Sequence, residues 1–149
     1  MHTVRFDEAP AYDAPGHALM KMVRLQGREA GPTDTVWLGV STIAPGGGTT
    51  LDASGVEKIY VVLEGEVALS NGRDEVKLRR WDSCRIAPGE GRQLRNDTDQ
   101  EASILLIMPL PPTPPACRSH RSRRPPSPEN HRTPHANPRP RPRRRPARE

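Results

Sequence analysis

The alternation of apolar and polar residues along the first 109 positions predicts a series of short β-strands. Segments such as "TVWLGVSTI" at 35–43 and "EKIYVVLEG" at 57–65 are rich in β-branched and aromatic residues and end near Gly or Pro. No helical spacing of apolar residues persists for three turns. We therefore expect an all-β antiparallel barrel or sandwich, with strands at 4–6, 17–27, 35–43, 57–65, 66–70, 74–78, 83–90, 92–96 and 102–109.

Turn residues separate these strands. Asn71-Gly72 lies between two alternating runs and predicts a two-residue type I′ hairpin turn, which needs positive φ at both positions. The run "APGGG" at 44–48 is interpreted as a loop that needs positive φ. It is not a phosphate-binding loop, because a strand follows it and the Gly-Lys-Ser/Thr ending is missing.

Charge and proline content divide the chain after residue 109. Residues 1–109 hold 12 Lys and Arg against 16 Asp and Glu, whereas residues 110–149 hold 11 Arg, two Glu and 12 of the 18 prolines. The second segment lacks aromatic residues and has no aliphatic side chain larger than alanine after Leu110. We therefore predict one folded domain at 1–109 and a disordered, basic Pro/Arg-rich tail at 110–149.

Other sequence signals limit the class of protein. Cys84 lies in the domain and Cys117 in the tail, so a structural disulfide is not expected. The longest apolar run, "ILLIM" at 104–108, has the length of one buried strand, and the N-terminus lacks a signal-peptide pattern. We expect a soluble cytoplasmic protein without a membrane partner.

Two motifs resemble those of the small single-domain cupins, a family of jelly-roll β-barrels. "APGGGTTLDASGVEKIYVVLEGEV" is similar to the first cupin motif, which has a His-x-His pair, a glutamate and a closing glycine. "WDSCRIAPGEGRQLRN" is similar to the second, in which a Pro-x-Gly turn precedes a histidine and an asparagine. The resemblance covers about 65 residues and implies a jelly-roll cupin barrel, a fold that hosts many activities. It also implies a homodimer formed through edge strands.

The resemblance places substituted residues at the metal-ligand positions of the family. The histidine pair corresponds to Asp52 and Ser54, the glutamate to Lys58, or to Glu57 if the register slips by one, and the last histidine to Arg92. Cationic side chains cannot ligate a metal ion. We therefore predict a metal-free barrel without a cofactor, unless His2 or His17 reaches the interior from a preceding segment.

If the alignment holds, Asp52, Ser54, Lys58, Tyr60 and Arg92 share one cavity, because inward residues recur every second position along a strand. Lys58 and Arg92 could then bind a carboxylate or stabilise an oxyanion, and Asp52 or Glu57 could transfer the proton. Further pocket residues are expected to be Trp37, Cys84 and Asn96. Cys84 and Tyr60 are also read as ordinary core residues, and Trp81 replaces a turn glycine of the family.

Three functional readings stay open from the sequence. The first is a metal-independent tailoring isomerase, cyclase or lyase of secondary metabolism that acts on an anionic or oxygenated small molecule. The second is a ligand-binding or accessory cupin without catalysis. A structural alternative to both is that the Asp, Lys and Arg side chains form a salt-bridge network in place of the lost metal. The third is a nucleic-acid-associated protein acting through the tail; nucleic acid is the least expected partner, because the tail has no aromatic residue for stacking.

Overall fold

The computed structural model describes residues 1–110, which form an all-β domain with two short 3₁₀ turns. The predicted tail lies outside the described residues from position 111 onward, as does Cys117. The elements in chain order are η1 (Phe6–Glu8), β1 (His17–Gln26), η2 (Arg28–Ala30), β2 (Val36–Thr49), β3 (Asp52–Ala53), β4 (Lys58–Glu64), β5 (Glu66–Ser70), β6 (Glu75–Arg79), β7 (Ser83–Ile86), β8 (Gly91–Arg95) and β9 (Ala102–Pro109).

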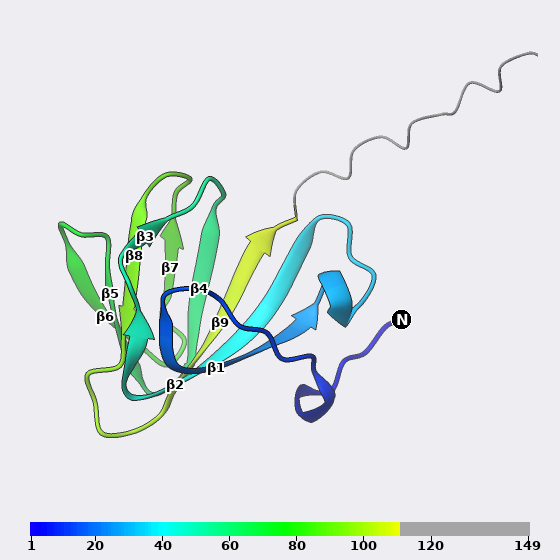
Figure 1. Ribbon diagram of the computed structural model, residues 1–149, viewed down its shortest axis with the longest axis horizontal. Helices are drawn as coiled ribbons and strands as arrows, with labels where there is room; N and C mark the ends of the chain where they lie inside the picture. Colours follow the sequence, from blue (N-terminus) through cyan, green and yellow to red (C-terminus); the bar gives the residue numbers. More distant parts are fainter. Residues whose placement is uncertain (111–149) are drawn as a thin grey trace, which may run out of the picture. The chain divides into compact units, whose positions relative to one another are not determined.

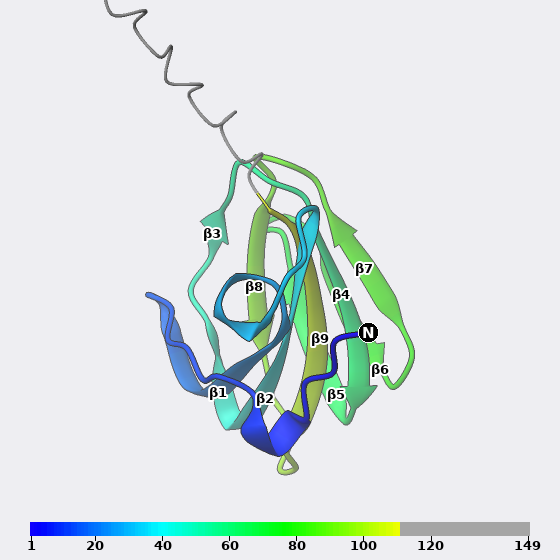
Figure 2. The ribbon, with the colours of Figure 1, turned by 90° about the vertical axis from the view of Figure 1, so that its right-hand side faces the viewer.

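The strands curl into a nearly closed antiparallel barrel. Hydrogen-bonded neighbours follow the order β6-β5-β8-β2-β9-β4-β7, while β1 pairs with β2 and β3 pairs with β8. In Figure 2, β8 and β3 lie on one side of the barrel, and β4 and β7 lie on the other. The long strand β2 takes part in both sides, because it pairs with β9 along its first half and meets β8 near its end (Figure 1). This arrangement confirms the predicted jelly-roll architecture.

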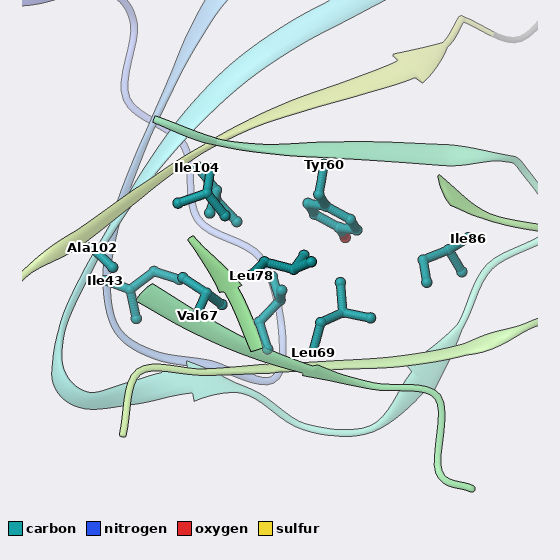
Figure 3. Packing of buried hydrophobic residues seen from close by; sticks show 10 residues of the cluster. Ile43, Tyr60, Val67, Leu69, Leu78, Ile86, Ala102 and Ile104 are labelled. Carbon is teal, nitrogen blue, oxygen red and sulfur yellow. The ribbon is translucent and has the colours of Figure 1, made fainter. Parts of the chain in front are cut away.

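The hydrophobic core fills the barrel interior. Its members come from nearly every strand, because alternate side chains of each strand point inward. In Figure 3, Ala102 and Ile43 lie at one end of the cluster and Ile86 lies at the other, with Tyr60 between them. The buried cluster consists of Ile43, Tyr60, Val62, Val67, Leu69, Leu78, Ile86, Leu94, Ala102 and Ile104.

The glycine-rich run at 44–48 is part of a strand and not the separate loop that we predicted. β2 continues to Thr49, and Gly46 has the expected positive φ of 73°. Gly48 is needed because β8 approaches closely: a Cβ on Gly48 would lie 2.1 Å from the Leu94 carbonyl oxygen. Any larger residue at this position would separate β2 from β8.

The hairpin at Asn71-Gly72 forms, but its turn is longer than the predicted type I′ turn. Ser70 pairs with Glu75, so four residues connect β5 and β6, and only Gly72 of the pair has positive φ. The Asn71 side chain explains the difference. Its Oδ1 accepts hydrogen bonds from the backbone N–H groups of Arg73 and Asp74, at 2.9 and 2.8 Å, and so closes an Asx-type turn.

Three further local predictions need correction. The segment 4–6 is not a strand; η1 begins at Phe6, and the N-terminal segment contacts the barrel through a bridge between Ala11 and Val23. The segment 83–90 forms a strand only to Ile86. The two-residue strand β3 was not predicted. Within residues 1–110, no helix is long and apolar enough to cross a membrane.

Trp81 lies in the turn between β6 and β7 in a conformation that favours glycine. Its φ is 73°, and its side chain is 67% exposed. The backbone N–H of Trp81 donates to the Val62 carbonyl at 2.8 Å, which holds the turn against β4. The positive φ of Trp81 is a conformation that glycine adopts without steric cost.

Candidate functional site

Strand β4 carries two polar side chains into the barrel interior. Lys58 is only 6% exposed and Tyr60 only 2%, and both alternate with less buried neighbours along the strand. Cross-strand register fixes their level: Lys58 lies opposite Ile86 on β7, and Tyr60 lies opposite Leu106 on β9. The sequence alternation therefore predicted the inward face of β4 correctly. On this face, the ammonium group of Lys58 lies beside an apolar core.

Strand β8 contributes the second cation. Arg92 is 7% exposed, and its Nη1 donates a hydrogen bond to Thr49 Oγ1 at 3.2 Å. Thr49 Oγ1 also accepts from the backbone N–H of Leu94 at 3.0 Å, so this hydroxyl ties the end of β2 to β8. Burial raises the pKa of Tyr60, and the nearby Arg92 guanidinium partly offsets that effect. Tyr60 is thus a protonated hydrogen-bond donor beside Arg92.

The two interior cations have no close carboxylate. Among residues 1–110, no Asp or Glu oxygen lies within 4 Å of a Lys58 or Arg92 nitrogen. Burial and the positive charge of Arg92 lower the pKa of Lys58, and Asp52 opposes this shift only weakly. The described part of the chain therefore does not form the Asp-Lys-Arg salt-bridge network that we considered as a structural alternative.

The predicted acidic partners lie outside the interior. Asp52 is paired in register with Arg92 across β3 and β8, but its side chain is exposed. Glu57 forms an ion pair with Arg85 on β7, and Ser54 Oγ donates to the Val56 carbonyl at 2.9 Å. We predicted Asp52 and Ser54 to share a cavity with Lys58. The backbone instead brings Asp52 to the edge of the site, and the Ser54 hydroxyl is used in a hydrogen bond within its own loop.

Three other predicted pocket residues have different roles in the fold. Trp37 is buried at the start of β2. Cys84 is half-buried against the core, and burial raises the pKa of its thiol, as expected for a core cysteine and not for a nucleophile. Asn96 is fully buried, but its Nδ2 donates to the carbonyls of Ile43 and Gln100 at 2.9 and 2.7 Å. We therefore assign Asn96 a structural role and remove it from the pocket.

The structure adds four polar residues to the interior that the sequence reading missed. Tyr12 comes from the segment before β1, Arg24 from β1, and Ser41 and Thr49 from β2. Burial raises the pKa of Tyr12, and the nearby Arg24 and Arg92 guanidinium groups partly offset that effect. Arg24 could have been found, because it continues the spacing of Met20 and Met22 with period two along the predicted strand. Ser41 could also have been found, because it alternates with Trp37 and Ile43 along the predicted strand 35–43. Nothing in the local sequence marks Tyr12 or Thr49.

The donor set at this site does not fit a metal ion. Lys58 and Arg92 are cations, and no group of three or more His, Cys, Asp or Glu side chains that could hold a metal occurs in residues 1–110. His2 Nε2 lies 3.0 Å from the Ala30 carbonyl, and His17 Nδ1 lies 2.9 Å from the Pro15 carbonyl. Neither histidine joins the interior group. The chemistry of these residues suits an anion.

A jelly-roll barrel with its functional side chains inside defines the class of protein, and comparisons with known proteins identify the family. Residues 39–108 match the family described as "Cupin domain". A Mycobacterium tuberculosis protein named beta-D-galactosidase Rv1717 is 40% identical over 111 residues, which cover 74% of this chain and 96% of that protein. The chain therefore belongs to the cupin family, as the two sequence motifs predicted.

Solved structures of other cupins share the fold. The polyketide cyclase RemF from Streptomyces resistomycificus matches with a TM-score of 0.67 and 20% identity, covering 76% of this chain and 82% of the cyclase. A sugar phosphate isomerase from Silicibacter pomeroyi matches with a TM-score of 0.62 and 21% identity, covering 73% and 76%. At these identities the similarity supports the barrel and not a reaction.

Proposed function

We propose that this protein binds a small organic anion inside the barrel and acts on it as a metal-independent isomerase, cyclase or lyase. The observation that carries the proposal is the pair of buried cations, Lys58 and Arg92, without a carboxylate within 4 Å in the described residues. An uncompensated buried charge is costly, and an anionic ligand would remove that cost. Non-catalytic binding of the same anion is the weaker form of this proposal.

The residues divide the chemistry between them. Arg92 and the protonated Tyr60 hydroxyl would stabilise the negative oxygen that develops when a proton is removed next to a carbonyl group. Lys58 has two forms in this proposal: its ammonium form binds the anion, and its neutral amine takes the substrate proton. Burial and Arg92 lower the pKa of Lys58 and so increase the fraction of the neutral amine. Asp52 and Glu57, the bases expected from the sequence, are exposed or paired with Arg85.

The test is ligand binding by purified protein with a lysine variant and a matched control. Lys58→Met should weaken binding of the monoanion D-galacturonate, measured by calorimetry, at least about 10-fold, because it removes one of the two charges. Lys77→Met, which removes an exposed lysine paired with Glu66, should leave the affinity unchanged. Equal affinities for the original protein and Lys58→Met would contradict the proposed anion site. Stoichiometric iron, nickel, manganese or zinc in the purified protein would contradict the metal-independent reaction.

The named activity of the Mycobacterium tuberculosis relative supports a second candidate, hydrolysis of a β-D-galactoside. Glycoside hydrolysis uses two carboxyl groups flanking the scissile bond. Asp52 on β3 and Glu57 just before β4 are the carboxylates that come from the segments next to Lys58. Release of nitrophenol from nitrophenyl β-D-galactoside should then fall at least about 100-fold in Asp52→Asn or Glu57→Gln. Unchanged rates in both variants would contradict this candidate.

A further inference from the structure

A second group of polar residues lies at the start of β2, on the side of the barrel covered by β1. The Arg24 guanidinium carbon lies 4.1 Å from the ring centroid of Tyr12 and 5.3 Å from that of Trp37. The two rings meet edge to face, with centroids 5.8 Å apart and an interplanar angle of 89°. We refer to Tyr12, Arg24 and Trp37 as the aromatic subsite.

The aromatic subsite contains hydrogen-bond donors without acceptors. Trp37 is 5% exposed, and its Nε1 has no acceptor among the described residues. The same is true of Arg24 Nε and of Arg92 Nε in the cation site. Buried N–H groups in folded proteins are nearly always paired, and each unpaired one costs about 1–3 kcal/mol. Three such donors near the interior of one barrel point to a ligand that supplies oxygen atoms.

The fold connects the aromatic subsite to the cation site. Gly39 on β2 and Tyr60 on β4 both pair with Leu106 of β9, so they lie at the same level of the barrel. A Cβ on Gly39 would lie 2.9 Å from Trp37 Cζ3 and 3.2 Å from the Tyr12 hydroxyl. The glycine therefore leaves the space that the Trp37 and Tyr12 side chains occupy. Only strand β9 separates this part of β2 from Tyr60 on β4.

The two groups differ in charge. Arg24 forms an ion pair with Glu29 through Nη1, so a carboxylate compensates the charge of this guanidinium. Lys58 and Arg92 have no such partner among residues 1–110. A second anionic group would gain little at Arg24, whereas an uncharged oxygen could accept the free N–H groups next to an apolar ring face.

We propose that the aromatic subsite binds an uncharged hydroxyl or carbonyl oxygen of the ligand whose anionic group meets Lys58 and Arg92. The substrate class is then an organic monoanion that carries neutral oxygens on a compact ring or chain. Trp37 Nε1 and Arg24 Nε are the specificity-determining donors. The statement that the same ligand carries an anionic group rests on the proposed anion site. The binding of a neutral oxygen at the aromatic subsite can be tested by itself.

The experiment uses three probes and the two indole groups of the chain. D-Galacturonate carries one negative charge and several hydroxyls, D-galactose carries the hydroxyls alone, and cyclohexanecarboxylate carries the charge alone. The full chain contains only Trp37 and Trp81 as tryptophans, so its ¹⁵N-labelled spectrum has two indole N–H signals, which the variant Trp81→Phe assigns. Trp81 lies in an exposed turn and provides the internal control.

D-Galacturonate is expected to move the Trp37 indole signal downfield, leave the Trp81 signal in place, and bind about 3- to 10-fold more tightly than cyclohexanecarboxylate. Trp37→Phe keeps an aromatic ring but removes the donor, and it should abolish that advantage. An unmoved Trp37 signal, with equal galacturonate binding in Trp37→Phe and the original protein, would overturn the aromatic subsite and leave the anion site intact.

The two proposals fail in different ways. If D-galactose binds as tightly as D-galacturonate, moves the Trp37 signal and is insensitive to Lys58→Met, the aromatic subsite stands and the anion site is wrong. If none of the three probes binds, both are wrong.

Discussion

The barrel interior has an apolar end, around Ile43, Ala102 and Ile104, and a polar end, around Lys58, Tyr60 and Arg92. At the apolar end the buried polar side chain of Asn96 donates two hydrogen bonds to backbone carbonyls. At the polar end two cations lie buried without a carboxylate partner within residues 1–110. The apolar end therefore contributes stability, whereas the polar end opposes it, which is the usual condition of a binding site.

The largest effect is expected from a cavity at the apolar end. Ile104→Ala should lower the free energy of unfolding by about 3 kcal/mol, because Ile104 is 1% exposed and its neighbours cannot fill the space. Urea denaturation measures the change. Val76→Ala, at an exposed position of β6, should change stability by less than about 0.5 kcal/mol. Similar losses in both variants would show that the apolar end is not closely packed.

The next effect tests the structural role of Asn96. Asn96→Ala should cost about 2 kcal/mol, because the buried Ile43 carbonyl loses the Nδ2 donor and the link from Asn96 to Gln100 is lost. Gln93→Ala on β8, the strand that ends just before Asn96, is the control and should cost much less. A stable Asn96→Ala protein with impaired galacturonate binding would instead return Asn96 to the pocket.

At the polar end, removal of a charge should stabilise the fold. Because the pKa of Lys58 is lowered in the folded state, the unfolded chain binds more protons at a pH between the folded pKa and about 10.5, so stability rises with pH in that window. Lys58→Met should raise the free energy of unfolding at pH 7 by about 1 kcal/mol and weaken this rise. Urea denaturation of Lys58→Met and Lys77→Met at several pH values measures both changes in the free energy of unfolding. A less stable Lys58→Met protein would show that the ammonium group is compensated.

The smallest change in stability is expected outside the interior, at the exposed turn residue Trp81. Trp81→Gly should stabilise the protein by about 0.5 kcal/mol, because glycine adopts the positive φ of this turn without strain. Arg80→Gly, at a neighbouring residue without positive φ, should not stabilise it. Thermal denaturation distinguishes the two variants. Loss of stability in Trp81→Gly would assign the exposed ring a contact of its own.

The candidate site was predictable where it depends on strand alternation. Lys58 and Tyr60 alternate along one strand, and the second motif located Arg92. The prediction was wrong for Ser54, which is held in its loop, and for Asn96, which holds two backbone segments together. Arg24 and Ser41 follow the same kind of alternation and were missed. Tyr12 and Thr49 could not be found, because their inward positions depend on which segments lie side by side and not on a local pattern.

The sequence by itself determined the all-β class, the cupin family and the two inward cations, because period-two alternation and motif spacing are local properties of the chain. Only the tertiary structure decided that the cations lack a carboxylate partner within residues 1–110, that Asp52 and Glu57 stay outside, and that Arg24 and Tyr12 contact Trp37. These features depend on the pairing of strands far apart in the sequence, which sets the distance between charges and the partners of each buried donor.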